Sequence, residues 1–374
     1  MNDNATNDAI ELAPPIVRPP IVPPATVGIL GGGPTARYLE NIARQMGYRP
    51  LILDPNLSST ALLRAAADCD VVTVVDQLPI TAMRSVAAAA VPMHPSPEVV
   101  DLCTDRIRVK RFLEDLGVGV GPYVLIENEA DVAEAANTKF SAILKSRNHG
   151  GGRDGQVRVA NHGELLAAWE TLGRHACVLE QRLMLGRELA ITVSRTEDGR
   201  IATFAVSQQQ YVHGRLDISY APASLLGSGQ ADAADLAAYI ATELGFVGVL
   251  AVHMFVVGRE VYVHQLIAQP GPLGLFTLDS CRSDQYEQQL RAVCGLSLGE
   301  TAMSVPGIAV ISLAEELWSA GEPSWERILS DGTVHLHLYD ATDAQTRGHL
   351  AACSGTAAGS TSVVRRLRKE LTSG

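Results

Sequence analysis

The sequence has no long apolar run and no leader-like opening. No stretch approaches the roughly 20 consecutive apolar residues that a membrane-spanning helix needs. The chain opens with Asn2 and Asp3, whereas a secretory signal opens with basic and then apolar residues. We therefore expect a cytoplasmic protein with no membrane partner.

The chain also lacks a basic stripe and paired cysteines. Its formal net charge is -11, and its one clustered basic run, 364–369, is brief. Nucleic-acid phosphates require clustered Lys and Arg, so we expect no nucleic-acid partner. The six cysteines are scattered without a C-x-x-C pair, which favours reduced, mostly buried thiols over disulfides or a zinc cluster.

The remaining composition is sufficient for a sizeable core. The chain has 374 residues, of which 47% are hydrophobic and 19% charged, and this length favours two or three packed units. Residues 1–26 contain six prolines, which exclude a helix or an internal strand ladder. We predict a flexible arm there, with ordering against a partner subunit as the alternative.

Residues 27–103 alternate between strand and helix patterns. An apolar strand runs into the glycines 31–33, a helical pattern follows, and a second strand ends at Asp54. This order predicts a small doubly wound α/β unit. Gly32 and Gly33 either aim backbone N–H groups at an anion or form a purely structural turn, and Pro34 removes one donor from that turn.

A lysine-ending strand precedes a glycine-rich loop farther along. Strand 141–145 ends at Lys145, and the loop 148–155 contains four glycines. Backbone N–H groups and one ammonium can close over a polyphosphate, so this segment is either a phosphate lid or a flexible hairpin tip. Earlier in the chain, residues 105–116 predict an amphipathic helix with Arg106 and Lys110 one turn apart on its polar face, and we expect these charges to be solvated.

The next segments read as paired strands. Residues 177–183 and 187–193 either present backbone groups to an adenine and Glu188 to a ribose, or form a surface turn. Residues 247–255 and 261–266 predict a β-hairpin. Regular alternation places His253 and Gln265 on one face and favours a position for His264 behind it.

Several motifs resemble those of the ATP-grasp family, and in particular its carboxyaminoimidazole ribonucleotide synthetase group. They include Gly28-Ile29-Leu30-Gly31-Gly32-Gly33, Asp68-Cys69-Asp70, Lys110-Arg111-Phe112-Leu113, Asp279-Ser280-Cys281 and Gly348-His349-Leu350. The resemblance covers nearly the whole chain from residue 27. It implies an α/β fold, α+β in the lid, and a homodimer. The implied units are a doubly wound pre-ATP-grasp domain (27–103), an ATP-grasp domain (104–299) with a lid over about 117–182, and a C-terminal β-rich domain with a terminal helix (300–374).

The resemblance also implies a nucleotide site. Arg106 and Lys145 would contact the phosphates, the backbone from Glu180 to Leu183 the adenine, and Glu188 the ribose hydroxyls. Fixed cations and turn amides suit phosphate recognition. We therefore expect ATP or ADP as a ligand.

The reaction centre departs from the family pattern. The family's magnesium-binding carboxylates on the two hairpin strands are replaced by His253 and Gln265. Magnesium prefers hard oxygen ligands, so magnesium binding is doubtful. We do not expect a transition metal at His253, and we favour a general-base role for that imidazole. Tyr211 and Gln269 are predicted to line the rebuilt pocket with these two residues.

The substrate side is altered as well. The family's Arg-Pro-His-Asn-Ser-Gly-His motif is replaced by residues 269–275, and the lysine of its lid motif by Asp154. The positions predicted to line the substrate pocket are Gly32, Gly33, Gln77, Gly152, Arg153, Gly271 and Arg347.

Three functions remain open for this small-molecule site. The main hypothesis is a diverged enzyme of this group that acts on a small amine, nucleotide or amino-acid-like substrate in a specialised pathway. One alternative is a catalytically inactive homologue with a binding or regulatory role. The other is ordinary ATP-dependent carboxylation of aminoimidazole ribonucleotide in purine biosynthesis.

Overall fold

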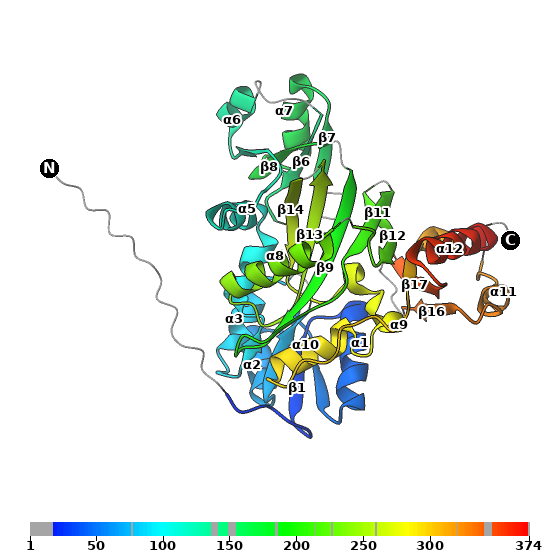
Figure 1. The fold of residues 1–374 in the computed structure, drawn as a ribbon. Helices are drawn as coiled ribbons and strands as arrows, with labels where there is room; N and C mark the ends of the chain where they lie inside the picture. The colour runs from blue at the N-terminus through cyan, green and yellow to red at the C-terminus, as the bar shows by residue number, and fades with distance from the viewer. Residues whose placement is uncertain are drawn as a thin grey trace.

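A computed structural model describes most of the chain. The described residues are 18–75, 78–135, 141–148, 155–183, 186–212, 214–225, 227–258, 260–319, 321–339 and 346–372. Three sheets organise them (Figure 1): an N-terminal sheet drawn in blue, a lid sheet at the opposite end, and a long central sheet between the two. Among the described residues, no helix is long and apolar enough to cross a membrane.

The N-terminal unit is a four-stranded parallel sheet flanked by helices. Its strand order is β2-β1-β3-β4, which is the doubly wound arrangement that the alternating pattern predicts. Its elements are β1 Thr26–Leu30, α1 Gly33–Gln45, β2 Arg49–Leu53, α2 Ser59–Ala67, β3 Val71–Val74, α3 Ile80–Ala87, β4 Met93–His94 and α4 Pro97–Thr104.

The lid is an antiparallel sheet with helices on one side. Its strand order is β5-β8-β6-β7, so β8 is paired on both edges. Helix α5 (Arg106–Asp115) leads into it, and its elements are β5 Tyr123–Ile126, α6 Glu129–Glu134, β6 Ala142–Ser146, β7 Gln156–Val159, α7 His162–Thr171 and β8 Cys177–Gln181.

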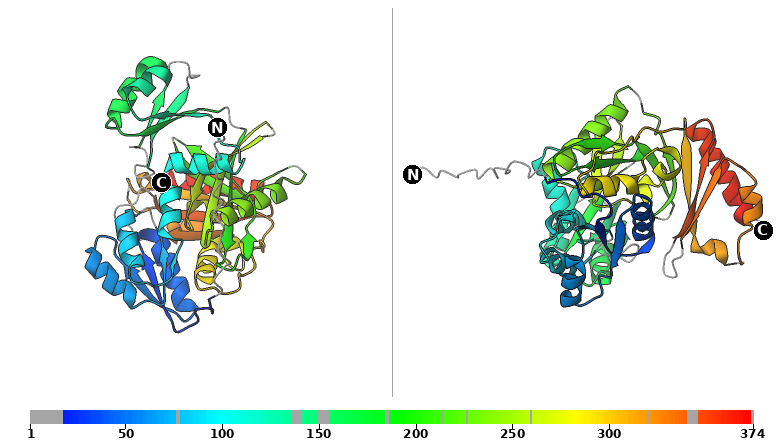
Figure 2. Two further views of the ribbon diagram at one scale, coloured as in Figure 1. Left: turned by 90° about the vertical axis from the view of Figure 1, so that its left-hand side faces the viewer. Right: turned by 90° about the horizontal axis from the view of Figure 1, so that it is seen from below.

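The central sheet has nine strands and includes the C-terminal strands. Its order is β14-β13-β9-β11-β12-β15-β17-β16, with β10 paired to β9. The first group of elements is β9 Arg187–Arg195, β10 Ile201–Thr203, β11 Ser207–Val212, β12 Arg215–Ala221, α8 Gly229–Glu243, β13 Gly248–Val257, β14 Glu260–Ile267, α9 Thr277–Ser280 and α10 Gln285–Val293. The second is β15 Ile308–Ala314, α11 Trp325–Leu329, β16 Val334–Leu338, β17 Thr346–Cys353 and α12 Ala357–Thr372. Residues after 300 thus extend the central sheet, and α12 covers its end (Figure 2).

The N-terminal unit and the central sheet share a core. Tyr286 and Leu290 of α10 pack in one buried cluster with Ile29 of β1 and Leu39 of α1. Burying side chains of this size contributes about 1.5–3 kcal/mol each. This shared cluster fixes the glycine turn between β1 and α1 relative to α10.

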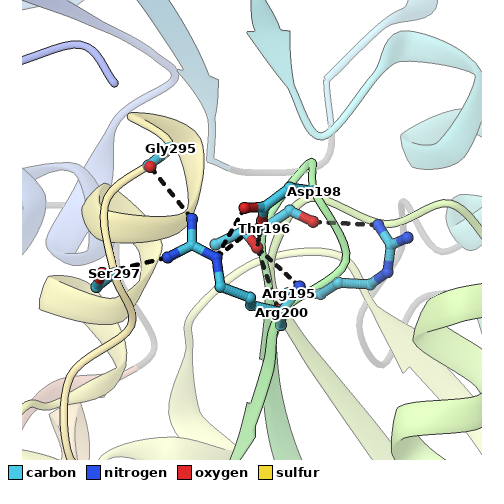
Figure 3. A network of polar contacts seen from close by, with 6 residues as sticks. All are labelled: Arg195, Thr196, Asp198, Arg200, Gly295 and Ser297. Atoms are coloured by element: carbon cyan, nitrogen blue, oxygen red, sulfur yellow. Dashed lines mark hydrogen bonds and ion pairs between the residues drawn. The ribbon is translucent and has the colours of Figure 1, made fainter. Parts of the chain in front are cut away.

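A polar network ties the β9–β10 turn to the end of α10 (Figure 3). The Arg200 guanidinium lies against the Asp198 carboxylate at 2.8 Å and donates to the carbonyl of Gly295 and the hydroxyl of Ser297. Thr196 donates its hydroxyl to Asp198. The network lies at the edge of the central sheet, where it holds the β9–β10 turn against the end of α10.

The cysteines are as expected from their scattered spacing. All six are free, and four of them are buried. Burial raises the pKa of the Cys103 thiol to about 12, so it stays protonated and unreactive at neutral pH.

Candidate functional site

A cavity of about 670 Å³ lies between the lid sheet and the central sheet. Its walls come from α5, β6, β7, β9, β11, β12, β13 and β14. The lining residues are Arg106, Ile143, Lys145, Gln156, Arg158, Glu188, Tyr211, Gly214, Arg215, His253, Phe255, His264 and Gln265. The structure therefore brings six of the predicted site residues together, namely Arg106, Lys145, Glu188, Tyr211, His253 and Gln265.

The lid wall is organised around the buried carboxylate of Glu180. Its two oxygens contact the ammonium groups of Lys110 at 3.0 Å and Lys145 at 2.6 Å. All three residues are at most 9% exposed. Burial alone would raise the pKa of Glu180, but the ammonium groups of Lys145 and Lys110 hold it well below its usual value. Glu180 is therefore ionised and fixes both lysines in place.

The same wall carries more positive than negative charge. Burial lowers the pKa of Lys145; Glu180 opposes this, and the nearby Arg106 and Lys110 add to the lowering. One carboxylate thus faces three cations, and an anionic ligand would relieve their repulsion. The expectation of solvated charges at Arg106 and Lys110 was wrong, because Lys110 is 3% exposed and Arg106 lines the cavity.

Arg106 is positioned by the start of α5. Asp105 caps this helix by accepting hydrogen bonds from the N–H groups of Ile107 and Arg108, and it also contacts the Arg147 guanidinium at 2.8 Å. The Arg106 side chain donates to the carbonyl of Ser146 at 3.1 Å. These bonds join the helix start to the end of β6, where Lys145 lies.

Glu180 and Leu183 do not line the cavity wall. Glu180 lies in β8 opposite Tyr123 on one side and Ile143 on the other, so its backbone belongs to the sheet. Its carboxylate is held by the two lysines. Arg182, just beyond the strand end, also donates its N–H to the carbonyl of Ser141, and the backbone contact to an adenine stays a prediction.

The hairpin floor contains a β-bulge that the sequence pattern does not reveal. His253 pairs with Gln265 and Met254 with Val263, so His264 is the extra residue of β14. The bulge breaks the alternation, and both His264 and Gln265 line the cavity. The expectation that His264 lies behind the cavity face was wrong for this reason.

The floor is aromatic and carries little charge. The His253 ring stacks on Tyr211 at 5.6 Å between centroids and meets Phe255 and His264 edge-on at 5.4 Å. Burial, with Lys145 second, lowers the pKa of His264 well below its usual value, so its ring is neutral at pH 7. Burial and then Glu188 raise the pKa of Tyr211, which stays protonated.

His253 is placed for an interaction with Glu188. The two atoms His253 Nε2 and Glu188 Oε2 are 3.5 Å apart, and among the described residues this Nε2 has no hydrogen-bond partner. A buried nitrogen without a partner is costly, so a ligand atom or a small movement of Glu188 would stabilise it.

This donor set does not fit magnesium. The facing positions of β13 and β14 offer an imidazole and a neutral amide, whereas magnesium prefers carboxylate and other hard oxygen ligands in octahedral geometry. Among the described residues that line the cavity, Glu188 is the one that carries a carboxylate.

Two further predicted residues lie outside the large cavity. Gln269 lines a small neighbouring cavity that shares Gln265 with the large one. Gly271 donates its N–H to Gln285 Oε1 at 2.9 Å, and its carbonyl accepts from Gln285 Nε2 at 3.0 Å. The Gly271 backbone is therefore bound within the protein and is not a free donor for a substrate.

The glycine turn after β1 has a structural cause. Gly31 has a φ of +129°, and a Cβ there would lie 1.9 Å from the carbonyl oxygen of Val75, so only glycine fits. A Cβ on Gly32 or Gly33 would meet open space. Their role in substrate binding remains a prediction.

The last predicted positions fall elsewhere. The guanidinium of Arg347 lies over the Trp318 ring, 4.5 Å from its centroid, and is engaged there. Gln77, Gly152 and Arg153 lie outside the described residues.

Several lining residues were missed from the sequence. Gln156 and Arg158 are two residues apart on β7, so both side chains point to one face of the lid sheet. This alternation can be read from the sequence and could have identified both residues. Arg215 at the start of β12 lines the cavity and reaches Glu316 at 3.1 Å, a pairing across 101 residues that no local pattern carries.

Comparisons with known proteins place this architecture in a family. Residues 111–286 match the ATP-grasp domain. The N5-carboxyaminoimidazole ribonucleotide synthase of Bacillus subtilis is 30% identical over 88% of this chain and 92% of its own length. The bifunctional purine synthesis protein of Dictyostelium discoideum is also 30% identical, but the chain spans only 37% of its length.

Solved structures agree with the sequence relatives. An ADP complex of N5-carboxyaminoimidazole ribonucleotide synthetase superposes with a TM-score of 0.86 at 25% identity, over 93% of this chain and 97% of that one. The resemblance drawn from the motifs and the predicted α/β fold are confirmed. This chain belongs to the N5-carboxyaminoimidazole ribonucleotide synthase family of ATP-grasp proteins.

Proposed function

We propose that this chain binds an adenine nucleotide in the large cavity and acts as an ATP-dependent ligase of its family. The observation that carries the proposal is the excess positive charge of the lid wall, where Lys145 and Arg106 face the cavity. A nucleotide diphosphate supplies the matching negative charge, and the solved relative is an ADP complex.

The chain's own residues divide the work of binding. Lys145 and Arg106 would donate to phosphate oxygens, and Glu188 would accept from ribose hydroxyls. The aromatic floor around His253 would exclude water beneath the phosphates. His253 Nε2 lies 3.5 Å from Glu188 Oε2, so a small movement of either side chain would bring the two within hydrogen-bond distance.

Carboxylation of aminoimidazole ribonucleotide is the first reaction to test. The Bacillus relative covers nearly the same length and carries the name of that activity. This whole-length relationship favours the family's own reaction over a changed substrate or a loss of catalysis.

We further propose that magnesium binds weakly at the β13–β14 hairpin. Two carboxylates of the family are replaced by His253 and Gln265, which removes negative charge close to the cation. Phosphoryl transfer relies on neutralisation of charge, so we expect slow turnover at ordinary magnesium concentrations. The second candidate is a non-catalytic role in nucleotide binding. The observation that favours it is the imidazole and the amide at His253 and Gln265, which suit magnesium poorly.

The test combines calorimetry and a turnover assay. Purified protein is titrated with ADP, and ADP release is then followed with ATP, bicarbonate, aminoimidazole ribonucleotide and magnesium. We expect one ADP molecule to bind per chain. We also expect ADP to be formed slowly from ATP, and only when aminoimidazole ribonucleotide is present. Binding without release would favour the second candidate, and the absence of ADP binding would contradict the proposal.

A further inference from the structure

A second polar cluster lies where three parts of the fold meet, and the nucleotide site does not include it. It joins Asp279 of α9, His337 of β16 and His349 of β17. One ligand atom from each of these residues lies within 4.8 Å of the others. Asp279 precedes His337 by 58 residues, and His337 pairs with His349 across β16 and β17, so the packing of α9 against these strands creates the cluster.

The acceptor and donor groups of the cluster converge. His337 Nε2 lies 2.9 Å from one Asp279 oxygen and 3.2 Å from the other. The His349 ring stacks on His337 with centroids 4.3 Å apart. His349 is fully buried, and its Nε2 has no hydrogen-bond partner in the described part of the chain.

Each imidazole is oriented by a tyrosine on its other nitrogen. Tyr38 of α1 shares a hydrogen bond of 3.2 Å with His337 Nδ1, and Tyr339 shares one of 2.7 Å with His349 Nδ1. Outer partners of this kind fix the tautomer and the ring orientation of metal-binding histidines. The Nε2 of His349 is thereby left for another partner, whereas the Nε2 of His337 lies against Asp279.

We propose that Asp279, His337 and His349 form a binding site for a divalent transition-metal ion of the zinc and cobalt class. Two imidazoles and one carboxylate are ligands that such ions accept, and a buried unpaired nitrogen would gain the partner it lacks. The two rings are nearly parallel, at 7°, so a ring must turn before both Nε2 lone pairs can meet one ion.

A third histidine, His335, lies at the exposed side of the site. His335 Nδ1 lies 3.5 Å from Asp279, and its side chain is 45% exposed. His335 and His337 are two residues apart on β16, so both side chains project from the same face. His335 can therefore pass an ion inward or complete its coordination.

A bound ion would join parts of the fold that are separate in the sequence. Asp279 belongs to the segment before α10, His337 and His349 belong to the C-terminal strands, and Tyr38 links them to the N-terminal unit. An ion that binds the folded chain and not the unfolded chain raises the melting temperature. This inference is independent of nucleotide binding, since no cluster residue lines the large cavity.

The test uses the full chain without an affinity tag. After treatment with a chelator, the protein is titrated with Zn²⁺ by calorimetry and with Co²⁺ by visible absorption. We expect one bound ion per chain and a higher melting temperature with Zn²⁺. We also expect a visible absorption spectrum that is typical of Co²⁺ with four or five ligands. Failure to bind one ion per chain would overturn the proposal.

Variants separate this site from adventitious binding. Asp279→Asn and His349→Gln should abolish the stoichiometric site, while His175→Gln, an exposed histidine of the lid, should leave it intact. Tyr339→Phe keeps the ring but removes the hydroxyl on His349, and it should weaken Zn²⁺ binding about tenfold to hundredfold. Equal Zn²⁺ affinity in Tyr339→Phe and the natural protein, or in folded Asp279→Asn, would also overturn it.

Discussion

The two walls of the large cavity differ in the charge that they carry. The lid wall keeps buried charge, with Glu180 held between Lys110 and Lys145 and with Arg106 at its edge. The hairpin floor instead presents imidazole rings and an amide at His253, His264 and Gln265. If the proposed nucleotide binding holds, phosphate recognition and metal recognition rest on different elements of the fold and can change separately.

The largest expected effect comes from the carboxylate that organises the lid wall. Glu180→Gln leaves two buried ammonium groups without their partner, which costs about 3–5 kcal/mol of unfolding free energy. Urea unfolding measures the loss. Glu316→Gln breaks an ion pair with Arg215 whose glutamate side chain is 71% exposed, and it should cost less than about 1 kcal/mol. Equal losses in the two variants would contradict the importance given to Glu180.

The two lysines that share Glu180 should differ in their effect on binding. Lys145→Met removes the ammonium that faces the cavity, so ADP affinity should fall about tenfold to hundredfold, as for the loss of a hydrogen bond to a charged group. Calorimetric titration with ADP measures this change. Lys110→Met is the matched control: it loses the same carboxylate partner but does not line the cavity, and it should bind ADP nearly as well. A larger loss in Lys110→Met would reverse the assignment.

The neutral floor predicts how stability depends on pH. The folded pKa of His264 lies well below the ordinary value of 6.5, so the unfolded chain binds a proton that the folded chain does not. Stability should therefore fall as the pH drops below about 6.5. The contribution of Glu180 has the usual sign for a carboxylate and is lost only below its ordinary pKa of 4.5.

Urea unfolding at pH 7.5 and pH 5.5 measures how much His264 contributes to this pH dependence of stability. His264→Gln should reduce the loss of stability between the two values, because glutamine takes up no proton. The exposed His175→Gln is the control and should keep the natural slope. An unchanged slope in His264→Gln would show that this imidazole is not held neutral. His349, whose pKa is also lowered well below its usual value by burial, accounts for part of the remaining slope.

The smallest effect is expected at Arg347. Its guanidinium is already engaged over Trp318, so Arg347→Ala should leave ADP affinity unchanged and lower stability by about 0.5–1 kcal/mol. Parallel titration and urea unfolding measure both quantities. A clear loss of ADP affinity would show that the Arg347 side chain contacts the nucleotide.

The sequence predicted the elements better than the contacts between them. The β-branched runs 247–255 and 261–266 predicted the β13–β14 hairpin, and the structure confirms it. The bulge at His264 was not predictable, because alternation assumes an uninterrupted ladder.

Contacts across long separations were also beyond the sequence. Residue types and the family resemblance brought Lys145, Glu188 and His253 to one cavity. The pairing of Glu180 with Lys110 depends on how α5 packs against the lid sheet, and the cluster at Asp279 depends on how α9 packs against the paired strands β16 and β17. Neither pairing leaves a local pattern that could be recognised.

The most direct test of the contrast between the two walls is the magnesium dependence of ADP binding. Calorimetric titrations with magnesium and with EDTA are compared for the natural protein and for the double variant His253→Glu/Gln265→Glu. The account predicts nearly equal ADP affinity under both conditions for the natural protein, and tighter binding with magnesium for the double variant. Strong magnesium dependence in the natural protein, unaltered in the double variant, would contradict it.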